Sequence, residues 1–320
     1  MARFVKVCSM CIPWIFREGT TGMESVERMK SYWNRRLDEI AIEKPDLIVL
    51  PEVCDRFNEM SVPEVLEYYE VRGNLILDFF RRKAAELNSY IAYSAVLKAE
   101  DGFYRNSTVM IARDGSVMGR YDKNYPMTDE IDDYGMIPGT ETPVFKCDFG
   151  TVGCMICFDL NFDKLRLRYA ALKPELLLFS SRYHGGMKQQ LWAYSCQSHL
   201  IGAIGGPNRP GVIMAPNGRV LAETTEYTQS LVYNLNLDCR HVHLDFNFEK
   251  LEALKRKYGS AVEIDDIGHL GAVLVRNHLE DRTIDELLSE FEIERLDDYL
   301  SRAEAYRNNF LKITNKEKSL

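Results

Sequence analysis

Several residue types and patterns are scarce in this chain of 320 residues, and each scarcity narrows what the protein can be. Basic residues do not exceed acidic ones: 40 lysines and arginines stand against 48 aspartates and glutamates. A net charge of -8 with interspersed signs leaves no basic stripe, which disfavours a nucleic-acid partner. No apolar run is long enough for a membrane span, and the N-terminus lacks a signal-peptide cleavage pattern. We therefore expect a cytoplasmic protein with no membrane partner.

Cysteines number only eight, too few for a disulfide scaffold in a chain of this length, and we expect reduced thiols. Two pairs, Cys8 with Cys11 and Cys154 with Cys157, have the spacing of a four-cysteine zinc site. Both pairs lie in apolar, β-prone runs, where residues three apart point to opposite faces. This geometry disfavours a zinc or redox site. Cys157, in GCMICFDLNF, is left as either a buried packing thiol or a nucleophile.

Histidines are also scarce: there are six, and all of them follow Cys157 in the chain. A cysteine protease needs a histidine that activates the sulfur, and chain order alone does not exclude that pairing. His184, in SSRYHGG after an apolar run, is the one histidine placed where a loop could reach a site. Shaping a pocket wall is the favoured interpretation of this histidine.

A pattern of a helix, a buried strand and a hairpin occurs twice along the chain. KPDLIVLPE (44–52) and KPELLLFSS (173–181) match position by position at their first three residues, and each follows a helix-periodic segment. IARDGSVMGRYDK and IMAPNGRVLAETT each place Asp-Gly or Asn-Gly between β-prone stretches, which predicts a hairpin. Because no long linker separates the repeats, we expect one domain with two similar layers, each a sheet covered by helices, and with the sheets face to face.

The last part of the chain has a different character and predicts a helical extension. We place the main domain at residues 1–275 and the extension at 276–320. Thr283 and Glu286 have capping-box spacing and precede leucines and aromatics set among charges. The extension could pack on the body of the protein or on a second subunit, because amphipathicity alone does not identify the partner.

Three charged residues lie where a fold of this kind could use them. Glu52 ends an apolar run in LPEVCD, and a desolvated carboxylate there has a raised pKa and can act as a base. Lys123 follows the first hairpin in GRYDKNYPMTDE, and Glu130 lies seven residues further on. Taken singly, each is equally an exposed surface charge.

Taken in order, these segments resemble the signature of the nitrilase, or carbon–nitrogen hydrolase, superfamily. LPE with Glu52, RYDKNYP with Lys123 and GCMICFDLNF with Cys157 are similar to its three catalytic segments. The resemblance extends to YRNSTVMIARDG, IPGTETPVFKCDFGTVG and GPNRPGVIMAPNGRVLAE, and spans roughly residues 4 to 240. It implies an α/β fold, a four-layer α-β-β-α sandwich of two similar halves.

The resemblance also implies a Glu-Lys-Cys triad formed by Glu52, Lys123 and Cys157, with Glu130 as a second active-site acid. Asp132 and Asp133 lie close to Glu130 in sequence and are alternatives for that acid. The backbone N–H of Phe158 would join Lys123 in binding the oxyanion. The family chemistry needs no metal and no organic cofactor. Family members associate through helical surfaces, so we expect a homodimer or a larger even-numbered homo-oligomer.

The expected activity is cleavage of a small, non-peptide amide, with release of ammonia or an amine. Family members that act on N-carbamoyl amino acids carry an arginine after Cys-x-Asp, where this chain has Leu160 and Asn161. Arg182 could replace that arginine. Tyr183, His184 and Trp192 are then expected pocket walls. N-carbamoyl compounds are the second expectation and nitriles the third, and a non-catalytic binding member of the same fold is the alternative outside this class.

Overall fold

The computed structural model describes residues 1–13, 15–206 and 210–317, so residues 207–209 of the segment GPNRPG lie outside it. The chain divides into two compact units. The larger unit is Val5–Leu235, and the smaller one combines Met1–Phe4 with Asn236–Leu320. Each unit has its own apolar core. Within the described ranges, no helix has both the length and the apolar character needed to cross a membrane.

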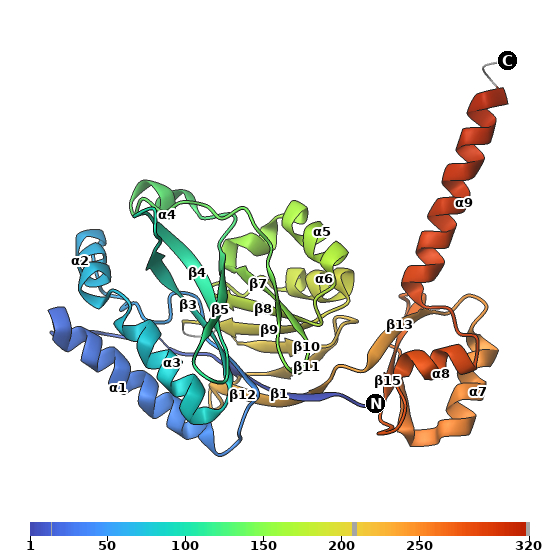
Figure 1. Cartoon of the computed structure of the whole chain (residues 1–320), viewed down its shortest axis with the longest axis horizontal. Coiled ribbons are helices and arrows are strands. Elements are labelled where there is room, and N and C mark those ends of the chain that lie inside the picture. The colour runs from blue at the N-terminus through green and yellow to red at the C-terminus, as the bar shows by residue number, and fades with distance from the viewer. Residues whose placement is uncertain (14, 207–209, 318–320) are drawn as a thin grey trace. The chain divides into compact units, whose positions relative to one another are not determined.

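Two six-stranded sheets form the centre of the larger unit (Figure 1). The first sheet has the order β12 (Ser230–Asn236), β1 (Phe4–Met10), β2 (Leu47–Val49), β3 (Tyr90–Lys98), β4 (Tyr104–Ile111) and β5 (Val117–Asp122). The second has the order β11 (Val220–Glu223), β10 (Val212–Met214), β9 (His199–Ile204), β8 (Leu176–Ser181), β7 (Thr151–Ile156) and β6 (Val144–Lys146). In each sheet three consecutive strands are parallel, β1 to β3 and β7 to β9, and an antiparallel hairpin follows them.

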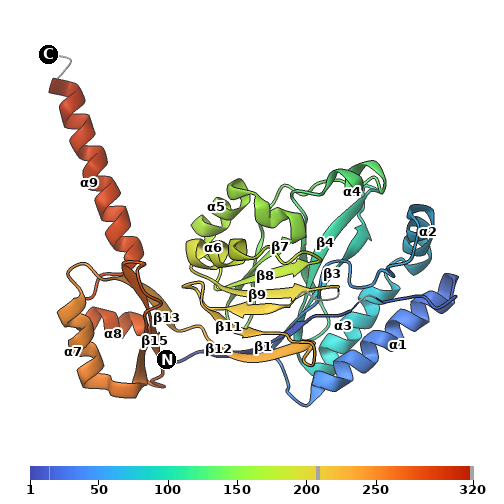
Figure 2. The same ribbon diagram turned by 180° about the vertical axis from the view of Figure 1, so that it is seen from behind.

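Helices cover the outer face of each sheet (Figures 1 and 2). α1 (Gly22–Ala41) and α3 (Leu75–Leu87) share an apolar core with the first sheet, and α5 (Asp163–Leu172) and α6 (Met187–Cys196) share one with the second. The sheets face each other: the Ser9 hydroxyl donates to the Gly202 carbonyl at 2.9 Å, and the Ser180 hydroxyl donates to the Leu50 carbonyl at 2.8 Å. The predicted four-layer α-β-β-α sandwich is confirmed.

The internal repeat seen in the sequence corresponds to equivalent local structure in the two halves. Lys44 and Lys173 both adopt left-handed backbone, with φ of 49° and 50°, where a helix ends before a buried strand. Two residues later, Asp46 accepts a hydrogen bond from a β1 amide at 2.8 Å, and Glu175 accepts one from a β7 amide at 3.0 Å. The same residue types therefore make the same turn and the same strand-to-strand bond in each half.

Both predicted hairpins are present, as β4–β5 and β10–β11. Gly115 and Gly218 have φ of 82° and 83°, a left-handed conformation that glycine adopts without a steric penalty. Each glycine N–H donates at 2.9 Å to the carbonyl three residues earlier, Ala112 in one turn and Ala215 in the other. Lys123 directly follows β5, the second strand of the first hairpin.

The smaller unit is a three-stranded antiparallel sheet with helices, in the order β13 (Cys239–His243), β15 (Ala272–Asn277) and β14 (Val262–Asp265). Its helices are α7 (Phe248–Tyr258), α8 (Ile284–Glu290) and α9 (Leu296–Glu317), with a short 3₁₀ turn at Gly259–Ala261. α9 projects beyond the rest of this unit in both views (Figures 1 and 2). Leu300, Tyr306, Phe310 and Leu311 are exposed along it.

The unit boundary differs from the predicted division between residues 275 and 276. The structure divides the chain at Asn236, and the C-terminal unit contains strands as well as helices. β13 and β14 each pair with β15 rather than with either six-stranded sheet, which assigns all three strands to the smaller unit. β15 begins with four consecutive apolar residues, 272–275, as the buried strands of the main domain do, and composition alone did not separate them.

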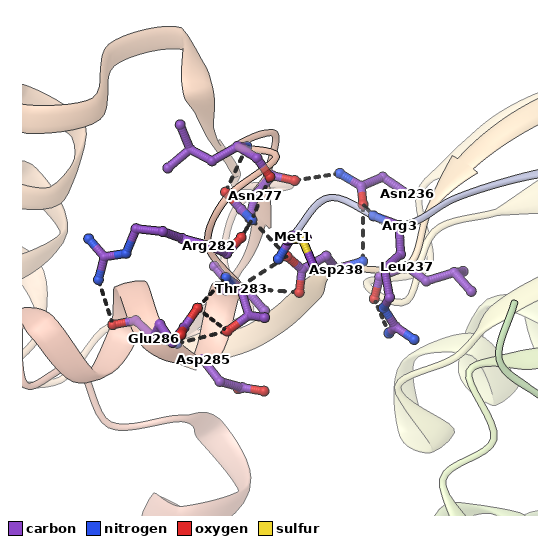
Figure 3. Close-up of polar contacts among 12 residues, drawn as sticks. Met1, Arg3, Asn236, Leu237, Asp238, Asn277, Arg282, Thr283, Asp285 and Glu286 are labelled. Carbon is purple, nitrogen blue, oxygen red and sulfur yellow. Dashed lines mark hydrogen bonds and ion pairs between the residues drawn. The ribbon is translucent and has the colours of Figure 1, made fainter.

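The first residues of the chain belong to the smaller unit through polar contacts (Figure 3). The Leu237 N–H donates to the Arg3 carbonyl at 2.8 Å, and the N-terminal amine of Met1 lies 3.5 Å from the Asp238 carboxylate. Asp238 is 4% exposed and also accepts from Asn277 Nδ2 at 2.7 Å. This buried acid therefore joins the N-terminal segment to β15.

Candidate active site

Glu52 is held at the end of a fully buried strand. β2 (Leu47–Val49) continues through Leu50 and Pro51 to this acid, which is 6% exposed. The next residue, Val53, has φ of 45°, a conformation that is sterically costly for a β-branched side chain. The Arg56 N–H closes this turn by donating to the Val53 carbonyl at 3.0 Å. The strained turn ends the strand abruptly and leaves Glu52 at the sheet edge.

Lys123 follows β5 and is 2% exposed. Its Nζ lies 2.9 Å from Glu52 Oε1 and 2.6 Å from Glu130 Oε2. A lone buried ammonium would be costly, and two carboxylates at this distance offset that cost. The structure therefore brings together three of the four predicted catalytic residues in one hydrogen-bonded group.

Glu130 is the acid beside Lys123, rather than Asp132 or Asp133. It lies in the short helix α4 (Thr128–Asp132), and its Oε2 accepts from the Met127 N–H at 2.7 Å. That bond fixes the carboxylate against the start of the helix. Asp132 and Asp133 are exposed.

Asn106 is a site residue that the sequence analysis missed. It lies on β4, is 2% exposed, and its Nδ2 donates to Glu52 Oε1 at 2.9 Å and to Glu130 Oε1 at 2.8 Å. Its backbone carbonyl accepts from the Lys123 N–H at 2.8 Å. Asn106 Oδ1 is buried and has no hydrogen-bond partner among the described residues. The one available signal was its position in YRNSTVMIARDG, a segment that resembles the family.

Cys157 lies directly after β7, at the start of a 3₁₀ turn, Cys157–Asn161. Its φ is 46°, so the strand stops at this residue as the first half stops at Val53. Glu52, Lys123, Ser181 and the backbone of Arg182 all influence the pKa of its thiol, so the sulfur belongs to the same group of residues. Residues in such strained conformations concentrate at functional sites.

The pKa shifts place the negative charge on Glu52 rather than on sulfur. Burial by itself would raise the pKa of Glu52, but the charge of Lys123 and hydrogen bonds from Lys123, Cys157 and Asn106 hold it below its usual value. Burial would also lower the pKa of Lys123, but Glu52 and Glu130 raise it above the usual range. Lys123 is therefore a permanent cation and Glu52 an anion at neutral pH.

The Cys157 thiol is protonated in the same state. Burial raises its pKa to about 12, and the charge of Glu52 adds to the rise. Lys123, the Arg182 N–H and the Ser181 hydroxyl act in the opposite direction. The arrangement is therefore a neutral thiol in the field of an ionised carboxylate, which suits proton transfer to a general base during attack.

Asp159 connects the cysteine turn to the lysine segment. It is 0% exposed and accepts from the Tyr121 hydroxyl at 2.6 Å, the Tyr125 N–H at 2.9 Å and the Ile156 N–H at 3.0 Å. Tyr121 and Tyr125 lie two residues on either side of Lys123. Burial raises the pKa of Asp159 to about 6, against the effect of these hydrogen bonds.

The loop after β8 brings backbone rather than an arginine side chain to the sulfur. The Arg182 guanidinium donates to Asn58 Oδ1, while the Arg182 backbone N–H and the Ser181 hydroxyl lower the pKa of the Cys157 thiol. The Tyr183 N–H donates to the Ser181 hydroxyl at 2.8 Å, and both Tyr183 and His184 are half-buried. His184 Nδ1 accepts from the N–H of a glycine in its own loop at 3.1 Å. The group that can act as a base for Cys157 is therefore Glu52. Among the described residues, no histidine is one of the groups that shift the pKa of this thiol.

Phe158 and Trp192 occupy different environments, although both were expected to contact substrate. Phe158 is 36% exposed and meets Phe162 edge-on, with ring centroids 5.4 Å apart. Trp192 is 1% exposed, and its indole N–H donates to the Leu160 carbonyl at 3.0 Å. Trp192 thus supports the cysteine turn from within the core of the second sheet, a packing position and not an open wall.

The two cysteine pairs do not form a common cluster. All eight cysteines are free, and Cys8 and Cys154 are 0% exposed in apolar cores. Cys11 Sγ instead accepts from the Ile204 N–H at 3.4 Å. Across the described ranges, no group of three or more histidine, cysteine or acidic side chains is arranged to hold a metal ion.

Comparison with known proteins agrees with this fold. The amidase from Nesterenkonia sp. matches with a TM-score of 0.64 and 16% identity, over 79% of this chain and 97% of that one. A variant of that amidase carries the acetamide moiety of fluoroacetamide covalently on its active-site cysteine, and matches at 15% identity and TM-score 0.64 over 79% and 96% of the two chains.

Two curated relatives show weaker sequence similarity. The probable hydrolase YhcX of Bacillus subtilis is 26% identical over 45% of this chain and 29% of its own length. The chloroplastic omega-amidase of Arabidopsis thaliana is 23% identical over 64% of this chain and 62% of its own length. The chain thus spans less than two thirds of each of these two relatives.

The family model for carbon-nitrogen hydrolase matches residues 22–203, which is more than half of the chain. The chain belongs to the carbon-nitrogen hydrolase family, as the sequence resemblance predicted. The matched range contains Glu52, Lys123, Glu130 and Cys157.

Proposed function

We propose that this protein is an amidase-type hydrolase in which Cys157 cleaves the carbon–nitrogen bond of a small, non-peptide amide through a thioester. One observation carries the proposal: the buried, ionised Glu52 carboxylate lies 2.9 Å from the Lys123 ammonium, and both charges act on the pKa of the Cys157 thiol. The nucleophile, its base and a fixed positive charge are therefore preassembled.

In the first half-reaction, the sulfur of Cys157 adds to the amide carbonyl while its proton passes to Glu52. The carbonyl oxygen becomes an oxyanion, held by the Lys123 ammonium and the Phe158 N–H. The carbon–nitrogen bond then breaks, and Glu52 returns the proton to the departing nitrogen. Ammonia or an amine leaves, and the acyl group stays on sulfur as a thioester.

In the second half-reaction, Glu52 takes a proton from a water molecule while the oxygen of that water adds to the thioester carbonyl. The carbon–sulfur bond breaks, the proton returns to sulfur, and the carboxylic acid leaves. Glu130 holds Lys123 and Asn106 in place at 2.6 and 2.8 Å and orients the substrate nitrogen. The unpartnered Asn106 Oδ1 is a suitable acceptor for a substrate N–H.

Amides are the first substrate class, N-carbamoyl compounds the second and nitriles the third. All three present an electrophilic carbon bonded to nitrogen, and all three can form a covalent intermediate on sulfur. A non-catalytic binding protein of the same fold is the alternative outside this class. The intact group of Glu52, Lys123 and Cys157 favours catalysis, because a binding protein has no need to hold a base against a buried thiol.

The proposal extends to the cellular setting and the assembly. We infer a cytoplasmic protein without nucleic-acid or membrane partners, from its acidic, interspersed charge. We also infer a homodimer or a larger even-numbered homo-oligomer. Four apolar residues on the neighbouring helices α5 and α6 support this assembly, since each is at least 46% exposed: Leu167, Leu172, Met187 and Leu191.

Replacing the nucleophile tests the mechanism. We expect Cys157→Ala to abolish release of ammonia or amine over a panel of amides, N-carbamoyl compounds and nitriles, with its melting temperature nearly unchanged. We also expect iodoacetamide to label Cys157 fastest, as shown by peptide mapping, because Glu52 accepts its proton, and Glu52→Gln to slow that labelling.

Cys147→Ala is the matched control, since Cys147 is the half-buried cysteine whose thiol pKa burial likewise raises to about 12. This variant should retain full turnover. Activity in Cys157→Ala, or preferential labelling of Cys147 or Cys154, would refute the assigned nucleophile.

A further inference from the structure

Asn161 is the last residue of the 3₁₀ turn that begins at Cys157, and its side chain makes two hydrogen bonds. Its Nδ2 donates to the Phe158 carbonyl at 3.0 Å, and its Oδ1 accepts from Lys188 Nζ. Asn161 and Lys188 are both half-buried. The amide therefore links α6, where Lys188 lies in the first turn, to the residue that directly follows the nucleophile.

Lys188 determines which way the Asn161 amide is turned. An ammonium group has donors only, and a backbone carbonyl is an acceptor only. The amide oxygen must therefore face Lys188, and the amide nitrogen must face the Phe158 carbonyl. In the reversed orientation both hydrogen bonds would be lost, because donor would meet donor and acceptor would meet acceptor.

The position of Lys188 is unfavourable for the helix that carries it. A cation in the first turn is opposed by the helix dipole. In the part of the chain that the structure describes, Lys188 forms no ion pair, and its Nζ binds Asn161 instead. Gly185 allows this approach: its φ is 77°, and a Cβ atom there would lie 2.1 Å from Leu160 Cδ2. The loop before α6 is thus shaped to bring Lys188 onto the cysteine turn.

The backbone of Phe158 has few other restraints. Its ring is 36% exposed and meets Phe162 edge-on. Ile156 is the last residue of β7 that pairs with β8, so Phe158 lies beyond the strand ladder. The Asn161 amide holds the peptide group between Phe158 and Asp159. This group shares the Phe158 Cα with the peptide group that carries the Phe158 N–H, so fixing one limits the rotation of the other.

We propose that Asn161, oriented by Lys188, is a positioning residue that aims the Phe158 N–H at the oxyanion formed when Cys157 attacks. This inference rests on the proposed amidase function and adds to it two side chains that do not touch the substrate. A donor that is fixed before the reaction stabilises the transition state without a cost of reorganisation, and a small displacement weakens that effect strongly. Asn161 is thus used within the protein rather than on the substrate.

Four variants separate the two hydrogen bonds of the amide. Asn161→Ala removes both, and Asn161→Asp keeps the contact with Lys188 but places an acceptor against the Phe158 carbonyl. Lys188→Met removes the orienting donor, whereas Lys188→Arg retains one. Asn34→Ala is the matched control, because Asn34 is also half-buried and its Nδ2 donates at 2.8 Å to Asp38 on α1.

Two probes of Cys157 differ in whether an oxyanion forms. Butyraldehyde takes the sulfur at its carbonyl carbon, its oxygen becomes the oxyanion, and the thiol proton passes to Glu52. Because the aldehyde has no leaving group, this adduct can only reverse. Iodoacetamide forms a carbon–sulfur bond as iodide leaves, and no oxyanion develops. A residue that acts through the Phe158 N–H should affect the first reaction and not the second.

We expect both Asn161 variants to lower kcat roughly tenfold or more for the amide that the wild type hydrolyses fastest, with KM nearly unchanged. The inhibition constant of butyraldehyde should rise by a similar factor, while the rate of labelling by iodoacetamide stays close to that of the wild type. Lys188→Met should show a smaller effect in the same direction, and Lys188→Arg and Asn34→Ala should show none.

Two results would overturn the proposal while leaving the amidase function intact. One is turnover with an unchanged butyraldehyde constant in both Asn161 variants. The other is a loss of iodoacetamide labelling as large as the loss of kcat, which would show that the nucleophile itself had been disturbed.

The aldehyde also gives a readout that does not depend on turnover. If the wild type hydrolyses no amide, the proposed function fails, and protection of Cys157 from iodoacetamide by butyraldehyde, measured by intact mass, still compares the variants. A need for roughly tenfold more aldehyde in Asn161→Asp would support the positioning role. Equal protection in the variant and the wild type, or none in the wild type, would refute it.

Discussion

Asp159 shows how one buried side chain can fix the positions of two catalytic groups relative to each other. Its carboxylate accepts from the turn that presents Cys157 and from residues on both sides of Lys123. An ionised carboxylate can accept all three hydrogen bonds at once, while a protonated one brings a hydrogen of its own into a group of donors. The protonation state of Asp159 should therefore control the relative position of nucleophile and lysine.

We predict that kcat falls below about pH 6 because Asp159 becomes protonated there. Glu52 cannot produce this limb, since its pKa lies below the usual value for a glutamate. The raised pKa of Asp159 also means that protonation favours the folded state, so unfolding through this residue does not explain the loss. Activity profiles between roughly pH 4.5 and 8 measure the effect.

Two variants distinguish this assignment from other acids. Asp159→Asn should lower kcat at neutral pH on the order of tenfold, through misplacement of the reacting groups, and should remove the acid limb. Tyr121→Phe should move the limb to higher pH, because the Tyr121 hydrogen bond lowers the pKa of Asp159. An unchanged limb in Asp159→Asn would exclude it as the titrating group.

Residues with a local sequence signal could be predicted, and residues defined only by their surroundings could not. Glu52, Lys123 and Cys157 lie in short segments typical of the family, at the ends of strands that the sequence itself predicts. Asn106 lies in YRNSTVMIARDG, a segment whose resemblance to the family does not single out this asparagine.

At the scale of elements, the smaller unit contains a capping box at the N-terminus of α8 (Figure 3). Thr283 Oγ1 accepts from the Glu286 N–H at 3.2 Å, and Glu286 Oε2 accepts from the Thr283 N–H at 2.6 Å. The next residue, Ile284, is 0% exposed, and its N–H donates to Asp238 at 3.1 Å. The helix start is thus fixed both by its own cap and by the buried acid that also binds the N-terminal segment.

Removing that cap should loosen α8 locally. We predict that Thr283→Ala destabilises the helix by about 1 kcal/mol, the usual value for a lost N-cap. Hydrogen exchange of the amides of Ile284–Glu290 should then become roughly fivefold faster. Ser289→Ala, an exposed change in the same helix, is the control and should not speed exchange. Equal protection in both variants would show that tertiary contacts alone hold this end.

Elements were predictable where they repeat or where turn residues mark them. The two KP-strand segments and the two Gly-containing hairpins are confirmed, because each depends on interactions close in sequence. The capping box at Thr283 is confirmed for the same reason. The compact units of the structure divide at Asn236, ahead of β13, β14 and β15, whereas the sequence placed its boundary at 275/276, because strand pairing decides which sheet a strand joins and local periodicity does not.

At the scale of the whole molecule, exposed apolar side chains give the oligomer proposal a definite surface. α5 and α6 lie side by side over the second sheet in both views (Figures 1 and 2). Leu167 on α5 is 59% exposed, and Leu191 on α6 is 46% exposed. An isologous contact, in which this face meets its own copy, would remove both from water and create an even-numbered assembly.

We predict that light scattering at about 10 µM gives twice the monomer mass or a higher even multiple, consistent with an interface above roughly 1,000 Å². Leu167→Glu combined with Leu191→Glu should produce monomers, because like charges would then face each other across the symmetry axis. Leu300→Glu, on the exposed part of α9, is the matched control and separates this face from the C-terminal helix.

Two outcomes would contradict the assignment. A wild-type monomer that remains monomeric when residues 296–320 are removed would exclude self-association altogether. If Leu300→Glu produces monomers while the variant with Leu167→Glu and Leu191→Glu remains oligomeric, the interface lies on the C-terminal helix.

The smaller unit is built from both ends of the chain, and this has a consequence for biosynthesis. Met1–Phe4 are synthesised before the Val5–Leu235 segment, yet their partners at Leu237, Asp238 and Leu279 follow only after that entire segment has been made. The larger unit can therefore fold during translation, while the smaller one must wait for the late residues before its first four can dock. An N-terminal fusion that obstructs this docking should delay maturation of the smaller unit and leave synthesis of the hydrolase segment unaffected.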